Sequence, residues 1–236
     1  MPRISLMLVC AAVVAIAVLP PVVAAAAQPP FEFAVRQDRF LGGTSGTLVI
    51  HQDGIEFRTT DRKRARRWGY EALKQVRILS STRVTLETYE DRGRLRFGAD
   101  RAYAFEVPGS VPESAVAFLL DRLDRPMVTA VMPPLPATAL FRVAVKNASS
   151  RRGSDGTLLL YETGIAYVTE REGQARFWRF RDVYGVLALD RYRLQVLAYE
   201  GGSGETRPFT FELKTDLPPG MFDAIWQRVN SPIGRQ

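Results

Sequence analysis

The sequence predicts a mainly β protein made of two tandem copies of one small domain, each ending in a single helix. Three observations lead to this fold class: an internal repeat, a two-residue hydrophobic period along most of each copy, and a helical period at the end of each copy. At 236 residues the chain has room for two domains of ordinary size.

The repeat emerges when each residue is compared with the one 110 positions later. Between residues 46 and 90, 14 of 45 positions are identical without a gap, whereas chance would give about three. Beyond that stretch the second copy is four residues shorter, and the offset becomes 106. We therefore expect one domain over 31–123 and a second over 141–230. Recurring residues include Gly54/Gly164, Ala65/Ala175, Arg66/Arg176, Trp68/Trp178, Arg83/Arg193 and Glu90/Glu200.

Most of each copy has the period of a β-strand. Val84, Leu86 and Thr88 alternate with polar neighbours, as expected where one face of a sheet is buried and the other is solvated. Short polar segments with glycine separate the apolar runs and predict hairpin turns. Seven strands are expected in the first copy, near 31–36, 46–51, 54–60, 66–70, 75–79, 83–89 and 101–107.

The end of each copy has the period of a helix. Apolar residues recur at i, i+3, i+4 and i+7, which places them on one helix face. We expect each helix to close the open end of a bent antiparallel sheet and to bury this face. The residues are Val116, Leu119, Leu120 and Leu123 in the first copy, and Phe222, Ile225, Trp226 and Val229 in the second.

Seven antiparallel strands followed by one amphipathic helix resemble the pleckstrin-homology (PH) superfold, including the GRAM-like and bacterial PH-like domains. The resemblance covers nearly all of 31–123 and 141–230, and implies two tandem seven-stranded antiparallel barrels. Many PH domains carry a tryptophan at the helix position of Trp226, where the first copy has Leu120. A fold shared by so many proteins indicates architecture rather than function. The run similar to the middle of bacterial PH-like domains contains Trp68, Tyr70, Leu73 and Val76.

An N-terminal targeting segment is expected over residues 1–27. An apolar run over 4–19 follows Arg3, and two prolines and a run of alanines then supply a cleavage site. The competing interpretation is an uncleaved anchor, because residues 4–27 are long enough to span a bilayer. Both interpretations predict that the rest of the chain is exported, to a periplasm or to the outside of the cell. Cleavage would remove Cys10, the only cysteine, and with it any disulfide or thiolate chemistry.

The two copies are joined by a proline-rich segment over 124–140, and a short tail follows over 231–236. The segment is apolar as well as rich in proline, with Met127, Val131 and Leu135 among its residues. A free linker would be more polar. We therefore expect this segment to be stiff and to pack against one or both domains.

The charge of the chain is positive but evenly spread. The formal net charge is +7, and 28 of the 32 basic residues are arginines because only four are lysines. Residues 31–123 carry 16 basic and 13 acidic groups, and residues 141–230 carry 13 and 11, which leaves +3 and +2. A nucleic-acid-binding protein would more often concentrate its surplus on one segment. We expect no nucleic-acid partner.

One basic cluster stands out, on the predicted connection between the third and fourth strands. A hairpin tip there would present it to phosphate or to anionic lipid, whereas the alternative is a solvated tip without a ligand. The second copy has no counterpart, as expected of a site added to a duplicated scaffold. Phosphoinositide-binding PH domains carry their basic motif on another connection, between strands one and two. The candidate ligand-binding residues are Arg62, Lys63, Arg64, Arg66 and Arg67.

Catalysis is not expected. His51, the only histidine, is predicted on a strand surface and lacks the partners that a general base or a metal site requires. The sequence has no phosphate-binding glycine loop, zinc motif or nucleophile elbow, so we expect no cofactor, no metal and no catalytic residues. Trp68 and Trp178, which recur in both copies, are predicted core residues with arginine stems packed along them.

The leading functional hypothesis is therefore an exported, non-enzymatic binding or scaffold protein, with a protein or peptide as partner. Sheet edges, loop tips and the groove between the domains are the expected binding surfaces. The alternative is peripheral binding to anionic lipid head groups through the basic cluster. An enzyme with a site at the domain junction ranks third.

Overall fold

The computed structural model describes residues 30–38, 42–91, 100–149, 153–201 and 205–231. The predicted targeting segment over residues 1–27 lies outside the described residues, as do residues 232–236 of the predicted tail. No helix within the described ranges is long and apolar enough to cross a membrane.

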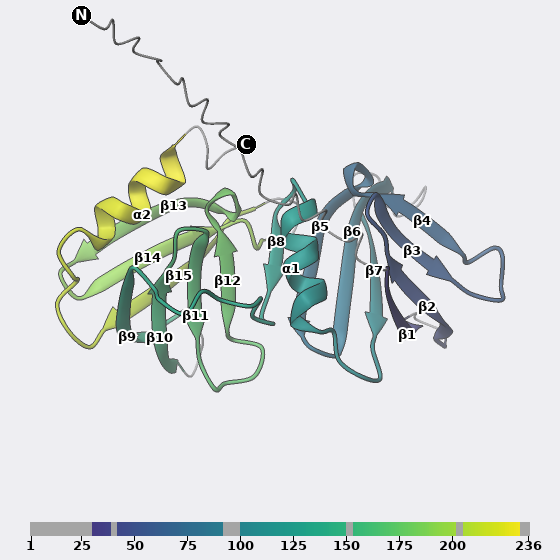
Figure 1. The fold of residues 1–236 in the computed structure, drawn as a ribbon, viewed down its shortest axis with the longest axis horizontal. Helices are drawn as coiled ribbons and strands as arrows, with labels where there is room; N and C mark the ends of the chain where they lie inside the picture. Colours follow the sequence, from purple (N-terminus) through teal and green to yellow (C-terminus); the bar gives the residue numbers. More distant parts are fainter. Residues whose placement is uncertain (1–29, 39–41, 92–99, 150–152, 202–204, 232–236) are drawn as a thin grey trace, which may run out of the picture.

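The first unit consists of seven antiparallel strands and one α-helix (Figure 1). Each predicted strand has a counterpart, because alternating side chains are buried as the pattern indicates. In β6, for example, Val84 and Leu86 are buried and Arg83 is exposed. The elements are β1 (Phe31–Gln37), β2 (Thr44–Ile50), β3 (Gly54–Arg58), β4 (Arg66–Gly69), β5 (Leu73–Ser80), β6 (Arg83–Asp91), β7 (Asp100–Glu106) and α1 (Glu113–Arg122).

The second unit repeats this order. In both units one turn of 3-10 helix separates the fourth strand from the fifth, at Tyr70–Ala72 and at Phe180–Asp182. The elements are β9 (Phe141–Asn147), β10 (Ser154–Leu160), β11 (Gly164–Val168), β12 (Arg176–Arg179), β13 (Val183–Asp190), β14 (Arg193–Ala198), β15 (Arg207–Leu213) and α2 (Met221–Asn230).

The proline-rich segment contains a strand, β8 (Met127–Thr129), that was not predicted from the sequence. This strand pairs parallel with β5 and antiparallel with β12, and all three of its residues are buried. Val131, Met132 and Leu135 pack against the core of the first unit. The expectation that this segment is packed rather than free is therefore confirmed.

Strand β8 joins the two units into one open 15-stranded sheet, with the order β13-β14-β15-β9-β10-β11-β12-β8-β5-β6-β7-β1-β2-β3-β4. The chain is mainly β with one α-helix per unit, as expected. The structure does not show two separate seven-stranded barrels, because β8 pairs with β5 on one side and β12 on the other and so continues the sheet between the units. Among the described strands, β4 and β13 are the two ends of the sheet order, and β13 lies beside α2 in Figure 1.

The two helices bury their apolar faces differently. The predicted face of α1 is correct, since Val116, Leu119, Leu120 and Leu123 are all buried. The predicted face of α2 is partly wrong: Trp226 is 50% exposed and Phe222 only half-buried. Ile225 and Val229 are buried as predicted, so the buried face of α2 is narrower than expected, and its members are four residues apart. This face consists of Met221, Ile225 and Val229.

A carboxylate is bonded to the core tryptophan in each unit. Trp68 and Trp178 are buried as predicted, and their indole Nε1 atoms donate to Glu90 (3.1 Å) and Glu200 (2.7 Å). In the second unit Arg176 also binds Glu200, with Nε 3.0 Å from Oε2 and both side chains almost fully buried. In the first unit the Tyr103 hydroxyl donates to Glu90 instead, at 2.6 Å.

The recurring arginines have three different environments. Arg66 and Arg176 each donate from Nη1 to two backbone carbonyls of the preceding turn, which fastens the connection between the third and fourth strands. Only Arg176 is buried against the core. Arg83 and Arg193 lie at the surface in exposed ion pairs, so the predicted packing of their stems along the tryptophans is wrong.

Replacing Glu200 with alanine should lower the free energy of unfolding by about 3–5 kcal/mol, because buried Arg176 and the Trp178 indole would lose their acceptor. Glu90→Ala is the matched control. Its side chain is 41% exposed, so water replaces the lost acceptor and we expect a loss of about 1–2 kcal/mol. Urea unfolding followed by tryptophan fluorescence measures both. Equal losses would contradict the difference in burial.

Candidate functional site

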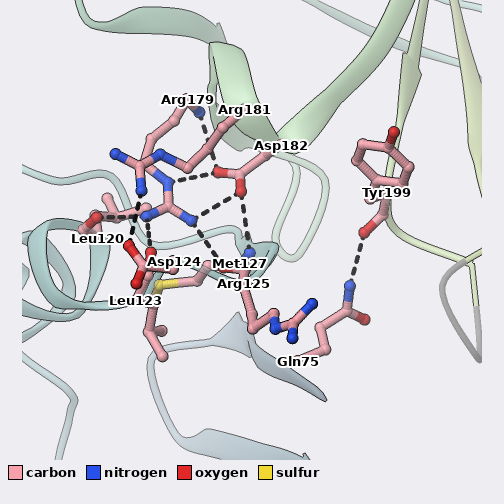
Figure 2. A network of polar contacts seen from close by, with 10 residues as sticks. All are labelled: Gln75, Leu120, Leu123, Asp124, Arg125, Met127, Arg179, Arg181, Asp182 and Tyr199. Atoms are coloured by element: carbon pink, nitrogen blue, oxygen red, sulfur yellow. Dashed lines mark hydrogen bonds and ion pairs between the residues drawn. The ribbon is translucent and has the colours of Figure 1, made fainter. Parts of the chain in front are cut away.

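The two units are held together by Arg179, at the end of β12. Its buried side chain donates five hydrogen bonds, and three of them cross to the helix and linker that follow the first unit (Figure 2). Nη1 binds the carbonyl oxygens of Leu120 (2.5 Å) and Leu123 (2.6 Å), and Nη2 binds that of Arg125 (3.0 Å). A cation at these carbonyls also suits the negative end of the α1 dipole.

Asp182 completes this junction. Its carboxylate accepts from Nε and Nη2 of Arg179, at 2.8 Å each, and from the backbone N–H of Met127 at 3.3 Å. The Asp182 side chain is only 2% exposed, so its charge depends on the guanidinium for compensation. The pair therefore fixes both the end of α1 and the start of β8 against the second unit.

Two further contacts support the junction. Nε2 of Gln75 donates to the Tyr199 carbonyl oxygen at 2.7 Å, as Figure 2 shows, and Arg77 donates to the Glu200 carbonyl at 3.2 Å. Four buried residues of the second unit also belong to the hydrophobic core of the first, so the units share apolar contacts as well. These residues are Leu159, Tyr161, Ala166 and Phe177.

A cleft of about 560 Å³ lies beside the junction, between α1 and the second unit. Its arginines are all engaged: Arg179 at the junction, Arg181 with Asp124 at 3.3 Å, and Arg228 with Glu162 at 2.6 Å. No histidine, cysteine or lysine lines it. Each of its arginines is therefore already paired within the protein. The lining residues are Ala117, Leu120, Asp121, Pro133, Pro134, Glu162, Thr163, Phe177, Arg179, Phe180, Arg181, Arg228 and Ser231.

The basic cluster lies on the turn between β3 and β4 and on the first two residues of β4, and all five side chains are exposed. Three of them have partners. Arg64 pairs with Asp61 at 2.8 Å, Arg67 pairs with Asp53 at 2.7 Å, and Arg66 binds turn carbonyls. Within the described residues, Arg62 and Lys63 have no side-chain partner. The cluster thus presents two free cations rather than five.

His51 does not lie on a strand, because β2 ends at Ile50. The ring is half-buried, and its Nε2 lies 3.0 Å from Oε2 of Glu56. The hydrogen bond from Arg58 is the largest cause that lowers the pKa of Glu56. This surface pair sits beside a turn, and the described residues contain no group of three or more His, Cys, Asp or Glu that could hold a metal ion.

An exposed apolar surface lies on the outer face of β13 and β14, and we call it the β13 patch. Tyr184 is 59% exposed, and its ring contacts that of Tyr199 edge-on at 5.9 Å. Leu187 and Leu189 are nearly half exposed, while α2 packs against the inner face of the same strand. We define the patch as Tyr184, Leu187, Leu189, Leu197 and Tyr199.

The β13 patch was not predicted from the sequence, although a signal for it was present. Residues 186–189 are continuously apolar, whereas a strand with one solvated face should alternate. A strand that is apolar on both faces is expected to have both faces covered. In the described structure only the inner face of β13 is covered.

No protein-family model and no curated protein sequence matches the chain. The solved "Structure of the Spt16D Pob3N heterodimer" matches 80% of this chain and 97% of that one, with 8% sequence identity and a TM-score of 0.28. At this TM-score the match supports no conclusion about the fold or function of this chain.

Replacing Arg179 with methionine should lower the free energy of unfolding by about 3–5 kcal/mol, since Asp182 would stay buried without its counter-charge. Arg181→Met is the matched control, because that ion pair is largely exposed, and we expect a change within about 0.5 kcal/mol. Urea unfolding measures both variants, and limited proteolysis reports cleavage within 124–140. Wild-type stability and an uncleaved segment in Arg179→Met would contradict the assigned role.

Proposed function

We propose that this chain is an exported, non-enzymatic binding scaffold that holds a protein partner on the β13 patch of its second unit. The observation that carries the proposal is an exposed apolar surface that, at three of its five positions, has a charged residue in the other copy. Contiguous exposed apolar surface on a folded protein marks an interaction site.

The comparison between the copies is specific. Lys74, Arg77 and Glu87 of the first unit correspond to Tyr184, Leu187 and Leu197 of the second. In the first unit Arg77 and Glu87 form an ion pair at 3.7 Å on the outer face of β5 and β6. The fold therefore accepts charged side chains at these positions, and the apolar residues of the second unit are not required by the architecture.

The rest of the molecule suits a scaffold. In this proposal each unit is a PH-like module, and the junction at Arg179 joins the two into one rigid support for the patch. Preorganised surfaces bind with less loss of conformational entropy. Export is supported by the N-terminal sequence, and a non-enzymatic role by the engaged charges of the cleft and by the single histidine.

A second candidate function is binding to an anionic surface. The observation that favours it is the pair of free cations at the tip of the β3–β4 turn, Arg62 and Lys63, which have no counterpart in the second unit. Each basic residue near an anionic bilayer contributes about 1 kcal/mol. Two cations support only weak, salt-sensitive binding, so this candidate ranks below the β13 patch.

Substituting Tyr184→Lys, Leu187→Arg and Leu197→Glu gives the second unit the polar residues of the first and should abolish partner binding while preserving the fold. Pull-down of exported proteins from the source cells, with the tagged chain as bait, should recover a partner with the wild type. We expect at least about tenfold less with the triple variant, because the apolar contact area is lost. Arg62→Glu/Lys63→Glu is the control that should retain binding. Equal recovery by the wild type and the triple variant would refute the proposal.

For the second candidate, co-sedimentation with phosphatidylglycerol vesicles at low salt is the measurement. Reversing both charges, in Arg62→Glu/Lys63→Glu, should weaken binding at least about tenfold. Arg142→Glu/Lys146→Glu makes the same change in net charge on exposed positions of β9 and is the matched control. Equal weakening by both pairs, or binding that salt does not affect, would exclude a site at the turn.

A further inference from the structure

The molecule contains an internal example of how the fifth strand of a unit binds an added strand. Strand β8 lies along the edge of β5, parallel to it, with Val76, Arg77 and Ile78 opposite Met127, Val128 and Thr129. The backbone N–H of Ala130 donates to the carbonyl oxygen of Ile78 at 2.8 Å. The edge of β5 is therefore occupied.

In the described structure no strand pairs with the equivalent edge in the second unit, where α2 packs against β13. Strand β13 pairs with β14 and is the last strand of the sheet. Ala188, the counterpart of fully buried Ile78, is exposed, as are Leu187 and Leu189 on either side of it. A long exposed apolar edge of this kind pairs readily with another chain, and proteins usually protect such edges with charge, proline or a covering segment.

The chemistry of this edge defines what would occupy it. No charged residue lies between Tyr184 and Leu189, and Asp190 at the end of the strand is paired with Arg193 at 2.8 Å. All three residues of β8 are uncharged and buried against the equivalent strand. A charged side chain at the centre of the added segment would be desolvated without a partner, at a cost in free energy.

We propose that β13 binds an extended, uncharged segment of the partner protein as an added parallel strand, opposite Val186, Leu187 and Ala188. This inference rests on the proposed function and specifies its mode of recognition. Backbone hydrogen bonds along the edge provide affinity, and the β13 patch beside the edge selects apolar side chains. The established pairing of β8 with β5 sets the expected direction and register.

The probe is a capped peptide with the sequence of residues 124–132, which contains β8, added to the intact chain. Hydrogen exchange should slow at least about threefold at the amides of 185–189. Methylating the peptide nitrogen of Ala130 should remove this protection, because that N–H faces the sheet edge in the internal example. Methylating that of Thr129 is the control, since successive amides of a strand point to opposite sides. Unchanged exchange with the unmodified peptide, or equal loss with both methylations, would overturn the inference.

A variant of the chain separates this inference from the proposed function. Ala188→Pro removes the N–H on the open side of β13 but keeps every side chain of the β13 patch, and proline is tolerated on an edge strand. We expect it to weaken peptide binding at least about tenfold, whereas Ala188→Ser, which keeps the N–H, should bind like the wild type. A thermal melt confirms that each variant is folded.

Each possible result for Ala188→Pro and for the triple patch variant leads to a different conclusion. If Ala188→Pro binds the peptide like the wild type while Tyr184→Lys/Leu187→Arg/Leu197→Glu does not, the patch is a binding surface and strand addition is wrong. If neither variant changes binding, both the inference and the proposed function fail. If the wild-type chain self-associates in ultracentrifugation and Ala188→Pro abolishes this, the occupant is a second copy of the chain. If deleting residues 232–236 makes the β13 amides exchange faster, the occupant is the tail of the same chain. Either result would overturn a partner segment.

Discussion

The arrangement of the whole molecule depends on one buried ion pair, Arg179 with Asp182. Burying two charges costs desolvation, and such a pair is stable only when further hydrogen bonds satisfy both groups. Here the guanidinium also binds the carbonyls at the end of α1, and the carboxylate also binds the first N–H of β8. Gly69 and Ala72 occupy the same positions of the first unit. The chain can therefore form this junction in only one order, with the helix of the first unit against the second.

The junction makes two similar scaffolds unequal. Because β8 occupies the space between the units, it covers the open side of β5 and of β12, and leaves β4 and β13 uncovered. The first uncovered strand carries Arg66 and Arg67 and lies beside the basic turn, so charge protects it from pairing. The second uncovered strand, β13, carries tyrosine and leucine in place of charged residues. Only one of the two free edges is thus suited to bind another chain.

The local parts of the fold could be predicted from the sequence, and the contacts between units could not. Alternation and the repeat located the strands, because burial on one face of a sheet leaves a two-residue period. The buried face of α2 was predicted too wide, because Ile225 and Val229 are buried whereas Trp226, one residue further round the helix, faces solvent. Strand β8 is only three residues long, too short for a period, and proline precedes it. Arg179 and Asp182 bind residues about 55 positions away in the sequence, so no local pattern marks them.

Divergence between duplicated copies has two physical causes, and burial separates them. Arg179 and Leu187 both differ from their counterparts in the first unit, Gly69 and Arg77. Arg179 is buried, and its Nη1 and Nη2 atoms donate hydrogen bonds to the helix and linker of the first unit. A glycine at this position could not make these bonds. Leu187 is 47% exposed, whereas its counterpart Arg77 donates to the Glu200 carbonyl at the junction. When a partner covers an exposed leucine, its apolar surface is removed from water, and this lowers the free energy. The buried differences thus account for the assembly of the two units, and the exposed ones locate the surface where a partner would bind.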